Sequence, residues 1–384
     1  MTTIRRMIYG EVLRTVGVVT LGFLLLFFGF DLIDELQDMT DQRLLRGYNL
    51  PVALLNVALQ VPEHLYALMP ITVLIGTIYV MARLAESSEY TILRTSGLGP
   101  RRALTMLLTL GLAFVAFTFV IGDYAAPAAG NVSQMLKARF LGKTLTTGRT
   151  GAWLKERQDG TAYSVNVGAL SAGGQMHNVR IFAFDAQTGR LQMTLRAPQA
   201  GFAPDGGWDL QQPERKTFST VDGTVDNHSS ASDAHQADPS VTIERPASLR
   251  WPTTLSQGMV AAAVLDPDGM QTFELFQYTR HLQANGQSAQ RYQIAFWRKV
   301  FYPLSCLVMM VLALPFAYLH FRTGNIAGYV FLGVLAGISF FLLNNLSGFI
   351  GNLRSWEPWL AAAAPGILYS ILSLGAFTWL VLRQ

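Results

Sequence analysis

The chain has 384 residues, of which 51% are hydrophobic and 14% are charged, and its formal net charge is +4. This composition is too apolar for an ordinary soluble protein and too polar for one that lies entirely in a bilayer. The small net charge gives no nucleic-acid footprint. The single cysteine, Cys306, excludes an intramolecular disulfide framework and cannot build a metal cluster alone. We therefore expect membrane spans combined with a soluble domain, with Cys306 in a packing role.

Six uncharged runs predict six transmembrane helices, three before and three after a long polar insertion. From the fifth run we expect one span near Ile326–Leu343, followed by an apolar outer loop. No small-residue cleavage site follows the first run, so an uncleaved span is favoured there. The runs are Thr15–Phe30, His64–Ala82, Ala103–Gly122, Val300–Leu319, Thr323–Leu353 and Pro358–Leu382.

The distribution of charge in the short loops predicts the orientation. The first outer loop, Asp31–Leu50, carries five acids and two arginines, whereas the segments assigned to the cytoplasm carry nine arginines against three glutamates. We expect both termini and the loop Arg83–Arg102 in the cytoplasm, and the insertion outside. The cytoplasmic arginines are Arg5, Arg6, Arg14, Arg83, Arg94, Arg101, Arg102, Arg322 and Arg383, and the glutamates are Glu11, Glu86 and Glu89.

The loop Arg83–Arg102 has the signals of a short helix at about residues 86–97. Ser87 or Ser88 is a candidate cap for its start, and Gly97 followed by Pro100 reads as its end. One face, at spacings of three and four, is apolar. This stripe either docks in a groove of another protein or belongs to a simple polar connector, and the residues alone leave both interpretations open. The stripe consists of Tyr90, Leu93 and Gly97.

The polar insertion, roughly Asp123–Lys299, changes its periodicity along the chain. From Gly151 to about Val241 the period is near two, with turns such as Asp185–Gly189, which predicts a β-sandwich or jelly roll. From Thr272, read as an N-cap, the pattern is helical as far as Asn285–Gly286, and a second helix from Ser288 runs into span four. We expect spans one to three with the cytoplasmic helix in 1–123, the all-β domain in 124–265, connecting helices in 266–299 and spans four to six in 300–384.

The sequence argues against an enzyme. Gly142-Lys143-Thr144 resembles the end of a phosphate-binding loop, but the glycine required five residues earlier is Lys137. His228 and His235, with nearby aspartates, match no standard metal spacing. Asp123, at the end of span three, reads as an interfacial charge in a turn. We expect no catalytic residue, no bound cofactor and no metal, so any nucleotide hydrolysis must come from a partner.

Four segments of the chain carry a family resemblance: Leu84–Arg102, Gly122–Pro127, Gly151–Val165 and Leu265–Ser305, the last being the most specific. They resemble the LptF/LptG permease family, whose members export lipopolysaccharide in Gram-negative bacteria. The resemblance implies an α-helical membrane protein with six transmembrane helices (3+3) and an inserted periplasmic all-β, jellyroll-like domain. It implies a non-catalytic subunit that extracts lipopolysaccharide from the outer leaflet of the inner membrane. It also implies assembly with an LptF-type permease, an LptB-type ATPase dimer that uses ATP and Mg, and a periplasmic bridge of LptC and LptA, without nucleic acid.

The resemblance also implies roles for particular residues. Glu89 matches the acidic position of the helix that couples such permeases to their ATPase. Asp34 and Lys137 match an acidic and a basic position near the lipid headgroup, but Asp31 and Asp38 stand where basic residues are expected. The candidate coupling residues are Glu89 together with Tyr90, Leu93, Arg94 and Gly97 of the same loop, and the resemblance implies Asp34 and Lys137 as lipid-binding residues. Arg139 lies just beyond Lys137, and the residues alone leave open whether these two bases meet an anionic headgroup or water.

Two other functions compete with lipopolysaccharide export. A membrane sensor would read a ligand with its periplasmic β-domain, but the loops assigned to the cytoplasm hold no output domain. An ABC permease for another lipidated cargo would share all the sequence features above. The proteins and the lipid that copurify with the chain separate these alternatives.

Overall fold

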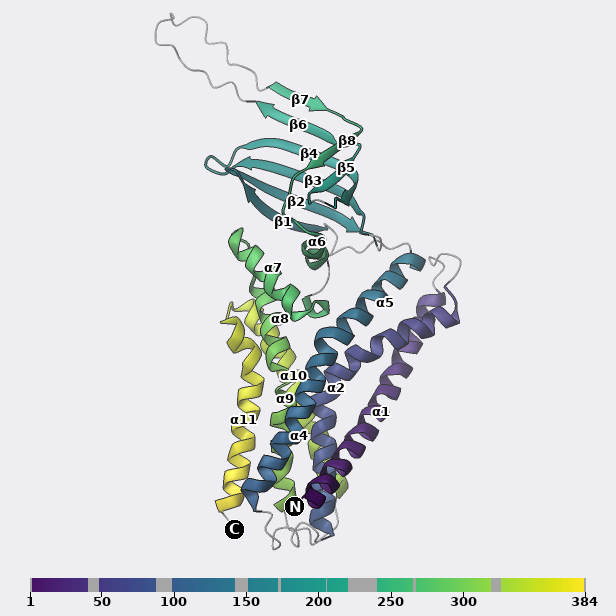
Figure 1. The fold of residues 1–384 in the computed structure, drawn as a ribbon, viewed down its shortest axis with the longest axis vertical. Coiled ribbons are helices and arrows are strands. Elements are labelled where there is room, and N and C mark those ends of the chain that lie inside the picture. Colours follow the sequence, from purple (N-terminus) through teal and green to yellow (C-terminus); the bar gives the residue numbers. More distant parts are fainter. Residues whose placement is uncertain are drawn as a thin grey trace, which may run out of the picture. The chain divides into compact units, whose positions relative to one another are not determined.

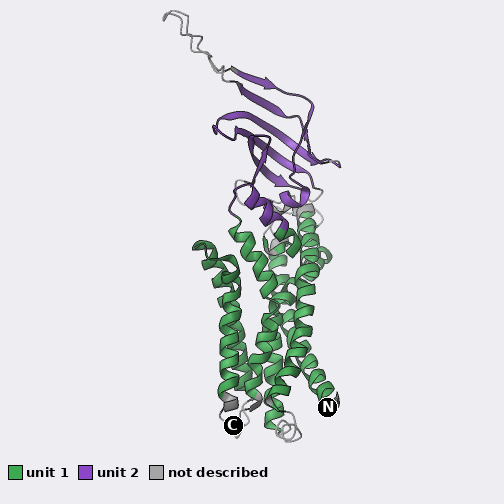
Figure 2. Ribbon diagram, turned by 60° about the vertical axis from the view of Figure 1, so that its left-hand side comes forward, with its two compact units in different colours: residues 1–140, 267–276, 289–384 green, residues 141–266, 277–288 purple. Residues whose placement is uncertain are grey.

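In a computed structural model, the chain forms two compact units (Figure 2). Unit 1 contains residues 1–140, 267–276 and 289–384, and unit 2 contains residues 141–266 and 277–288. The structure describes residues 2–40, 48–87, 99–141, 151–171, 174–204, 206–219, 240–264, 267–318 and 326–382.

Unit 1 is helical (Figure 1). Before the insertion it contains α1 (Thr2–Thr40), α2 (Leu50–Glu86), α4 (Pro100–Val120), the π-helix η1 (Ile121–Ala125) and α5 (Ala126–Leu141). After the insertion it contains α8 (Gln290–Phe301), α9 (Ser305–Ala313), the 3-10 helix η3 (Leu314–Tyr318), α10 (Ile326–Leu353) and α11 (Pro358–Leu382).

The described helices agree with six membrane spans. Five helical segments are long and apolar enough to cross a membrane, and the pair α8 and α9 makes a sixth if it counts as one span. This pair is bent by 45° at a short break. Pro303 lies in the break and has no N–H to continue the helical hydrogen bonding, which accounts for the bend. The helix α11 has the bounds predicted for span six.

Several helices differ from the predicted bounds. The first outer loop was expected to begin at Asp31, but α1 continues to Thr40. The fifth span was expected to end near Leu343, but α10 continues to Leu353, so the predicted apolar loop is helical. The prediction assumed spans of about 20 residues, the length that crosses the apolar core of a bilayer, whereas α1 and α10 are longer than that.

The loop between α2 and α4 also differs from the prediction at its ends. Ser87 is the C-cap of α2, because its backbone N–H and its hydroxyl both bond the carbonyl of Arg83. Pro100 begins α4, in keeping with the tolerance of the first helical turn for proline. The remaining residues of the predicted short helix, 88–97, lie outside the described part of the chain.

A continuous core joins α1, α2, α4 and α9 of unit 1. Val12 and Val16 of α1, Val73 of α2, Leu107 of α4 and Met310 of α9 are among its buried side chains. Cys306 belongs to the same core, is fully buried, and has its Sγ 3.4 Å from Thr118 Oγ1. This position agrees with the packing role predicted for the cysteine. Many other apolar side chains of these helices are exposed, as expected for faces that contact lipid.

Unit 2 is built on one eight-stranded antiparallel sheet (Figure 1). The strand order is β1-β2-β3-β4-β5-β8, while β6 pairs with β4 and β7. An inserted antiparallel β-domain is thus confirmed, but the jelly-roll detail of the prediction is not. The strands are β1 (Ala152–Gln158), β2 (Thr161–Leu170), β3 (Met176–Asp185), β4 (Leu191–Phe202), β5 (Trp208–Gln211), β6 (Glu214–Ser219), β7 (Ser240–Glu244) and β8 (Ser248–Trp251).

Alternation of buried and exposed side chains explains how the predicted strands pack. In β1 the side chains of Ala152, Leu154 and Glu156 are buried and those between them are exposed. Asp159 and Gly160, both at positive φ, form the two-residue turn between β1 and β2. The predicted domain boundary at residue 124 differs from the structure, in which α5 continues to Leu141 and the sheet begins at Ala152.

Three short helices follow the sheet: α6 (Gln257–Val264), the 3-10 helix η2 (Pro267–Gly269) and α7 (Thr272–Ala284). The helix α7 begins at Thr272, the residue that was predicted as its N-cap, and ends beside the predicted Asn285–Gly286 stop. Its first residues belong to unit 1 and the rest to unit 2. In unit 2, the side chains of Asn285 and Gln287 accept hydrogen bonds at 3.2 Å from the backbone N–H groups of Arg157 and Lys155. These bonds cover donors on the edge of β1 that would otherwise be unpaired.

Candidate functional site

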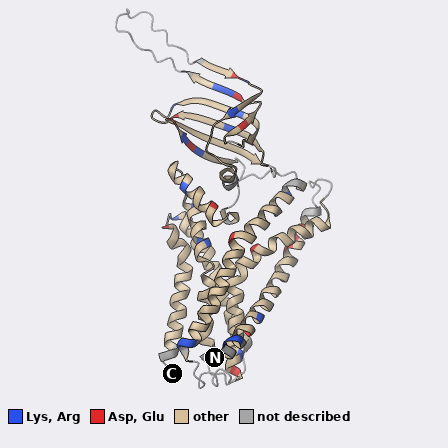
Figure 3. Ribbon diagram, in the orientation of Figure 1, with Lys and Arg blue, Asp and Glu red and all other residues tan. Residues whose placement is uncertain are grey.

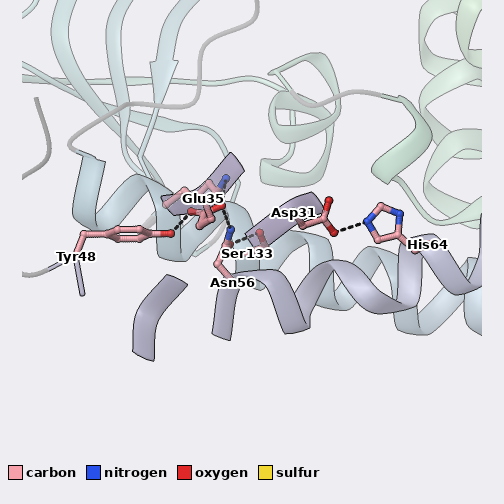
Figure 4. A network of polar contacts seen from close by, with 7 residues as sticks. Asp31, Glu35, Tyr48, Asn56, His64 and Ser133 are labelled. Carbon is pink, nitrogen blue, oxygen red and sulfur yellow. Dashed lines mark hydrogen bonds and ion pairs between the residues drawn. The ribbon is translucent and has the colours of Figure 1, made fainter. Parts of the chain in front are cut away.

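The site centres on Glu35, a carboxylate that α1 carries into the interior of unit 1 (Figure 4). Only 3% of this residue is exposed. Its carboxylate lies 3.0 Å from Lys137 Nζ of α5 and accepts a hydrogen bond, also 3.0 Å long, from the side-chain amide of Asn56 in α2. The hydroxyl of Tyr48 is a third donor. Burial of a charge is tolerable only with such partners, so Glu35 gathers three segments around itself.

Asn56 extends the contacts of Glu35 to a further side chain. It is fully buried, and its carbonyl oxygen accepts a hydrogen bond from Ser133 Oγ at 2.6 Å. Both ends of the amide are therefore used, the N–H group toward Glu35 in α1 and the oxygen toward α5 (Figure 4). Such a satisfied buried network fixes α1, α2 and α5 relative to one another at this level.

A second polar pair lies one helical turn before Glu35. Asp31 Oδ2 is 2.7 Å from His64 Nε2 of α2, and the imidazole stacks on Phe27 with ring centroids 5.0 Å apart (Figure 4). Phe27, Asp31 and Glu35 are spaced by four residues and so share one face of α1. That face is turned toward α2, which explains why two acids at the end of a membrane helix are tolerated.

The charges of the site leave one cationic group partly accessible. The Lys137 side chain is 35% exposed, whereas that of its partner Glu35 is 4% exposed. An ammonium has three N–H donors, so one ion pair leaves donors that can meet a second anion. The arrangement can bind an anionic group. Among the residues that the structure describes, no group of three or more metal-ligating side chains occurs.

The structure describes the side chains of two predicted lipid-binding residues, Lys137 and Asp34. Lys137 lies in the site, as above. Asp34 is exposed and points away from the buried face of α1, because neighbouring helical residues differ in direction by about 100°. Several residues named in the sequence analysis lie outside the described part of the chain: the side chain of Arg139, the histidines His228 and His235, and Gly142-Lys143-Thr144. The predicted coupling residues Glu89, Tyr90, Leu93, Arg94 and Gly97 lie outside it as well.

Sequence reasoning missed Glu35, Asn56, Ser133 and Tyr48. Glu35 was predicted to lie in a loop. The spacing of four residues between Asp31 and Glu35, which is typical of one helix face, was therefore not used. Extending α1 by two turns would have put both acids on one face. The contact of that face with Asn56, and of Asn56 with Ser133, depends on tertiary packing, which no local sequence pattern predicts.

Unit 2 contains its own buried carboxylate, Glu156 of β1, of which 2% is exposed. It accepts hydrogen bonds from the backbone N–H of Thr254, at 2.6 Å, and from the hydroxyls of Thr253 and Thr254. Burial lowers the pKa of His281 in α7, and the Glu156 carboxylate opposes this shift. These groups stabilise unit 2 and show no feature of a ligand site.

Fold and site define a multi-pass membrane protein with three spans on each side of an inserted antiparallel β-domain, and with a buried polar cluster suited to binding. The profile of the family described as "Lipopolysaccharide export system permease LptF/LptG" matches residues 6–382. The chain belongs to this family.

Individual relatives agree with the family match. The chain is 26% identical over 328 residues to the lipopolysaccharide export system permease protein LptG of Escherichia coli (strain K12), covering 85% of this chain and 84% of the relative. It is 24% identical over 339 residues to the protein of the same name from Haemophilus influenzae, covering 88% of this chain and 87% of the relative.

Proposed function

We propose that the chain is an LptG-type, non-catalytic permease subunit of the ABC transporter that exports lipopolysaccharide. The observation that carries this proposal is the family match over residues 6–382, which includes the spans, the β-domain and the polar site alike. In this role the subunit takes lipopolysaccharide from the outer leaflet of the inner membrane and passes it to a periplasmic protein bridge.

The partners and the orientation follow from the same proposal. The chain pairs with an LptF-type permease, and an LptB-type ATPase dimer supplies the energy from ATP and Mg. Both termini and the loop 83–102 lie in the cytoplasm, where the arginines of the short loops are concentrated (Lys and Arg are blue in Figure 3). The sheet lies in the periplasm with LptC and LptA. The ATPase acts through the loop residues Glu89, Tyr90, Leu93, Arg94 and Gly97.

The site contributes to lipid binding through Lys137. Its ammonium is partly exposed and pairs with Glu35, so an anionic lipid headgroup competes with a carboxylate already in place. A very high affinity for the lipid would slow transport, because a tightly bound lipid is released slowly. Glu35 moderates the attraction and neutralises the ammonium again once the lipid has left. Asp34 remains a proposed headgroup contact on the strength of the family resemblance, and Arg139 on its place in the chain just beyond Lys137.

Lipopolysaccharide copurification tests this role of Lys137. The complex is purified with its partner subunits in wild-type form and with Lys137→Gln, Glu35→Gln and both substitutions together, and the bound lipopolysaccharide is measured per complex. We expect Lys137→Gln to lower the lipid yield, because one ammonium donor is lost. Glu35→Gln should retain or raise the yield, because the competing carboxylate is gone while the amide keeps the shape of the side chain.

The double variant separates lipid binding from internal charge balance. If Lys137 serves only to neutralise buried Glu35, removing both charges restores the wild-type yield. If it binds lipid, the double variant stays as low as Lys137→Gln. Restoration by the double variant would contradict the binding role, and a wild-type complex that carries no lipopolysaccharide would contradict the proposed function itself.

A further inference from the structure

The third span ends in a π-helical turn that brings two functional groups to one place. This turn, η1 (Ile121–Ala125), follows α4 and precedes α5. Single π-turns inside helices are rare and frequently mark functional positions. Gly122 lies against Tyr66, and a Cβ on this residue would be 2.2 Å from the ring, so only glycine fits here without rearrangement. The turn thereby presents the Gly122 carbonyl and the Asp123 carboxylate to neighbouring segments.

Asp123 caps a helix that begins far away in the sequence. Its Oδ1 accepts a hydrogen bond of 2.7 Å from the backbone N–H of Thr272, the first residue of α7, and only 9% of Asp123 is exposed. The prediction that Thr272 caps α7 with its own side chain is wrong, because its buried hydroxyl has no hydrogen-bond partner in the described structure. A carboxylate is favoured at this end of a helix by the orphan N–H groups and the helix dipole.

A buried cation completes the junction. Lys299 of α8 is 9% exposed, and its Nζ donates hydrogen bonds to the Gly122 carbonyl, at 3.2 Å, and to the Met270 carbonyl. Met270 lies two residues before Thr272, the first residue of α7. Both charged side chains therefore bond the same short stretch of chain. One acid and one base, each nine-tenths buried, thus join the end of span three, the start of α7 and α8, all within unit 1.

We propose that Asp123 and Lys299 are positioning residues that transmit movement of the third span into α7. A helix is stiff along its axis, so a helix held at both ends passes a displacement of one end to the other. The N-terminus of α7 is held by Asp123, and within unit 2 the residues after its C-terminus, Asn285 and Gln287, are bonded to β1. This inference rests on the proposed function, in which the spans move during lipid export.

The test measures lipopolysaccharide delivered to an acceptor per ATP hydrolysed. The full complex is reconstituted in lipopolysaccharide-containing vesicles in wild-type form and with Asp123→Ala, Lys299→Met or Glu274→Ala. Glu274 is the matched control, because its carboxylate also accepts a backbone N–H at the start of α7, from Gln271, but makes no hydrogen bond to another segment among the described residues. Hydrogen exchange at the Thr272 amide reports independently whether the cap has been lost.

Asp123→Ala and Lys299→Met should each lower delivery per ATP by about fivefold or more, the lower range of allosteric coupling. Lipid copurification and ATP hydrolysis should stay at wild-type levels, which a merely destabilised fold would not allow. Exchange at Thr272 should rise in Asp123→Ala. Glu274→Ala should deliver lipid like the wild type.

Three outcomes would overturn the inference. One is wild-type delivery per ATP by Asp123→Ala with fast exchange at Thr272; another is an equal loss in Glu274→Ala. If the Asp123→Ala complex does not assemble, lipopolysaccharide delivered per ATP by Lys299→Met tests the inference instead. The third outcome is that neither variant assembles, which would mean that the junction serves folding alone. A wild-type complex that delivers no lipopolysaccharide would instead contradict the proposed function.

Discussion

Gly122 and Tyr66 approach each other so closely that a methyl group on the glycine would lie 2.2 Å from ring atom Cε2. Gly122→Ala should therefore destabilise the protein, by about 1–3 kcal/mol, the usual cost of overpacking. Gly130→Ala in α5 is the matched control, since an added Cβ there meets nothing within 4 Å and alanine favours a helix. Thermal unfolding of the two purified variants compares them, and equal melting temperatures would refute the close packing.

Glu156 offers a prediction for the stability of the β-domain. Glu156→Ala leaves the N–H and hydroxyl groups of Thr254 without their buried acceptor, so we expect a loss of about 1–3 kcal/mol. Asp209→Ala removes an exposed ion-pair partner of Arg250 and should cost at most about 1 kcal/mol. Urea unfolding followed by tryptophan fluorescence measures both. A loss for Asp209→Ala as large as that for Glu156→Ala would contradict the importance of burial.

The lowered pKa of His281 makes the stability of the β-domain depend on pH. Burial lowers its pKa in the folded state, so below the ordinary value of about 6.5 the unfolded state binds more protons than the folded state. The free energy of unfolding contributed by this group must then fall as the pH is lowered from about 6.5 toward its folded pKa.

His281→Gln should flatten this part of the pH profile. The measurement is urea unfolding at a series of pH values between about 5 and 7.5, where an ordinary histidine titrates. The profile of the variant should lose less stability on acidification than that of the wild type. Parallel profiles for the two proteins would show that another group controls the dependence.

A substitution at Glu89 tests whether the ATPase acts on the permease through the loop 83–102. Glu89→Arg should leave ATP hydrolysis in the assembled complex but reduce lipid release, since the proposed contact with the ATPase would be reversed in charge. Glu86→Arg is a control in the same loop, because Glu86 is exposed at the end of α2. The ratio of lipid released to ATP hydrolysed is measured for both. Normal release by Glu89→Arg would exclude the coupling role.

Local sequence patterns predicted much of the fold. Hydropathy located the spans because a bilayer of fixed thickness demands about 20 apolar residues, and α11 has the bounds of its uncharged run. Alternation located β1 to β4 because their inward side chains form the core of unit 2. Where the helices outrun the bilayer, as α1 does beyond Phe30, hydropathy gave no information and the helix was predicted to end too early.

The site and the junction were predicted only in part. Lys137 was identified by family resemblance, but its partner Glu35 was not, because the two meet through packing of α1 on α5. Asp123 was interpreted as a charge in a turn, and its bond to Thr272 joins residues 149 positions apart. Periodicity describes a residue's own segment, whereas both arrangements depend on which distant segment lies opposite.

The burial of Cys306 has a practical consequence for studying motion in this permease. It is the only cysteine of the chain, and its side chain is fully enclosed in the core of unit 1. A buried thiol reacts poorly with maleimide or methanethiosulfonate reagents. Spin labels or fluorophores can therefore be attached to single cysteines introduced on α7 or β7 while the native cysteine stays in place, and distances followed through the transport cycle.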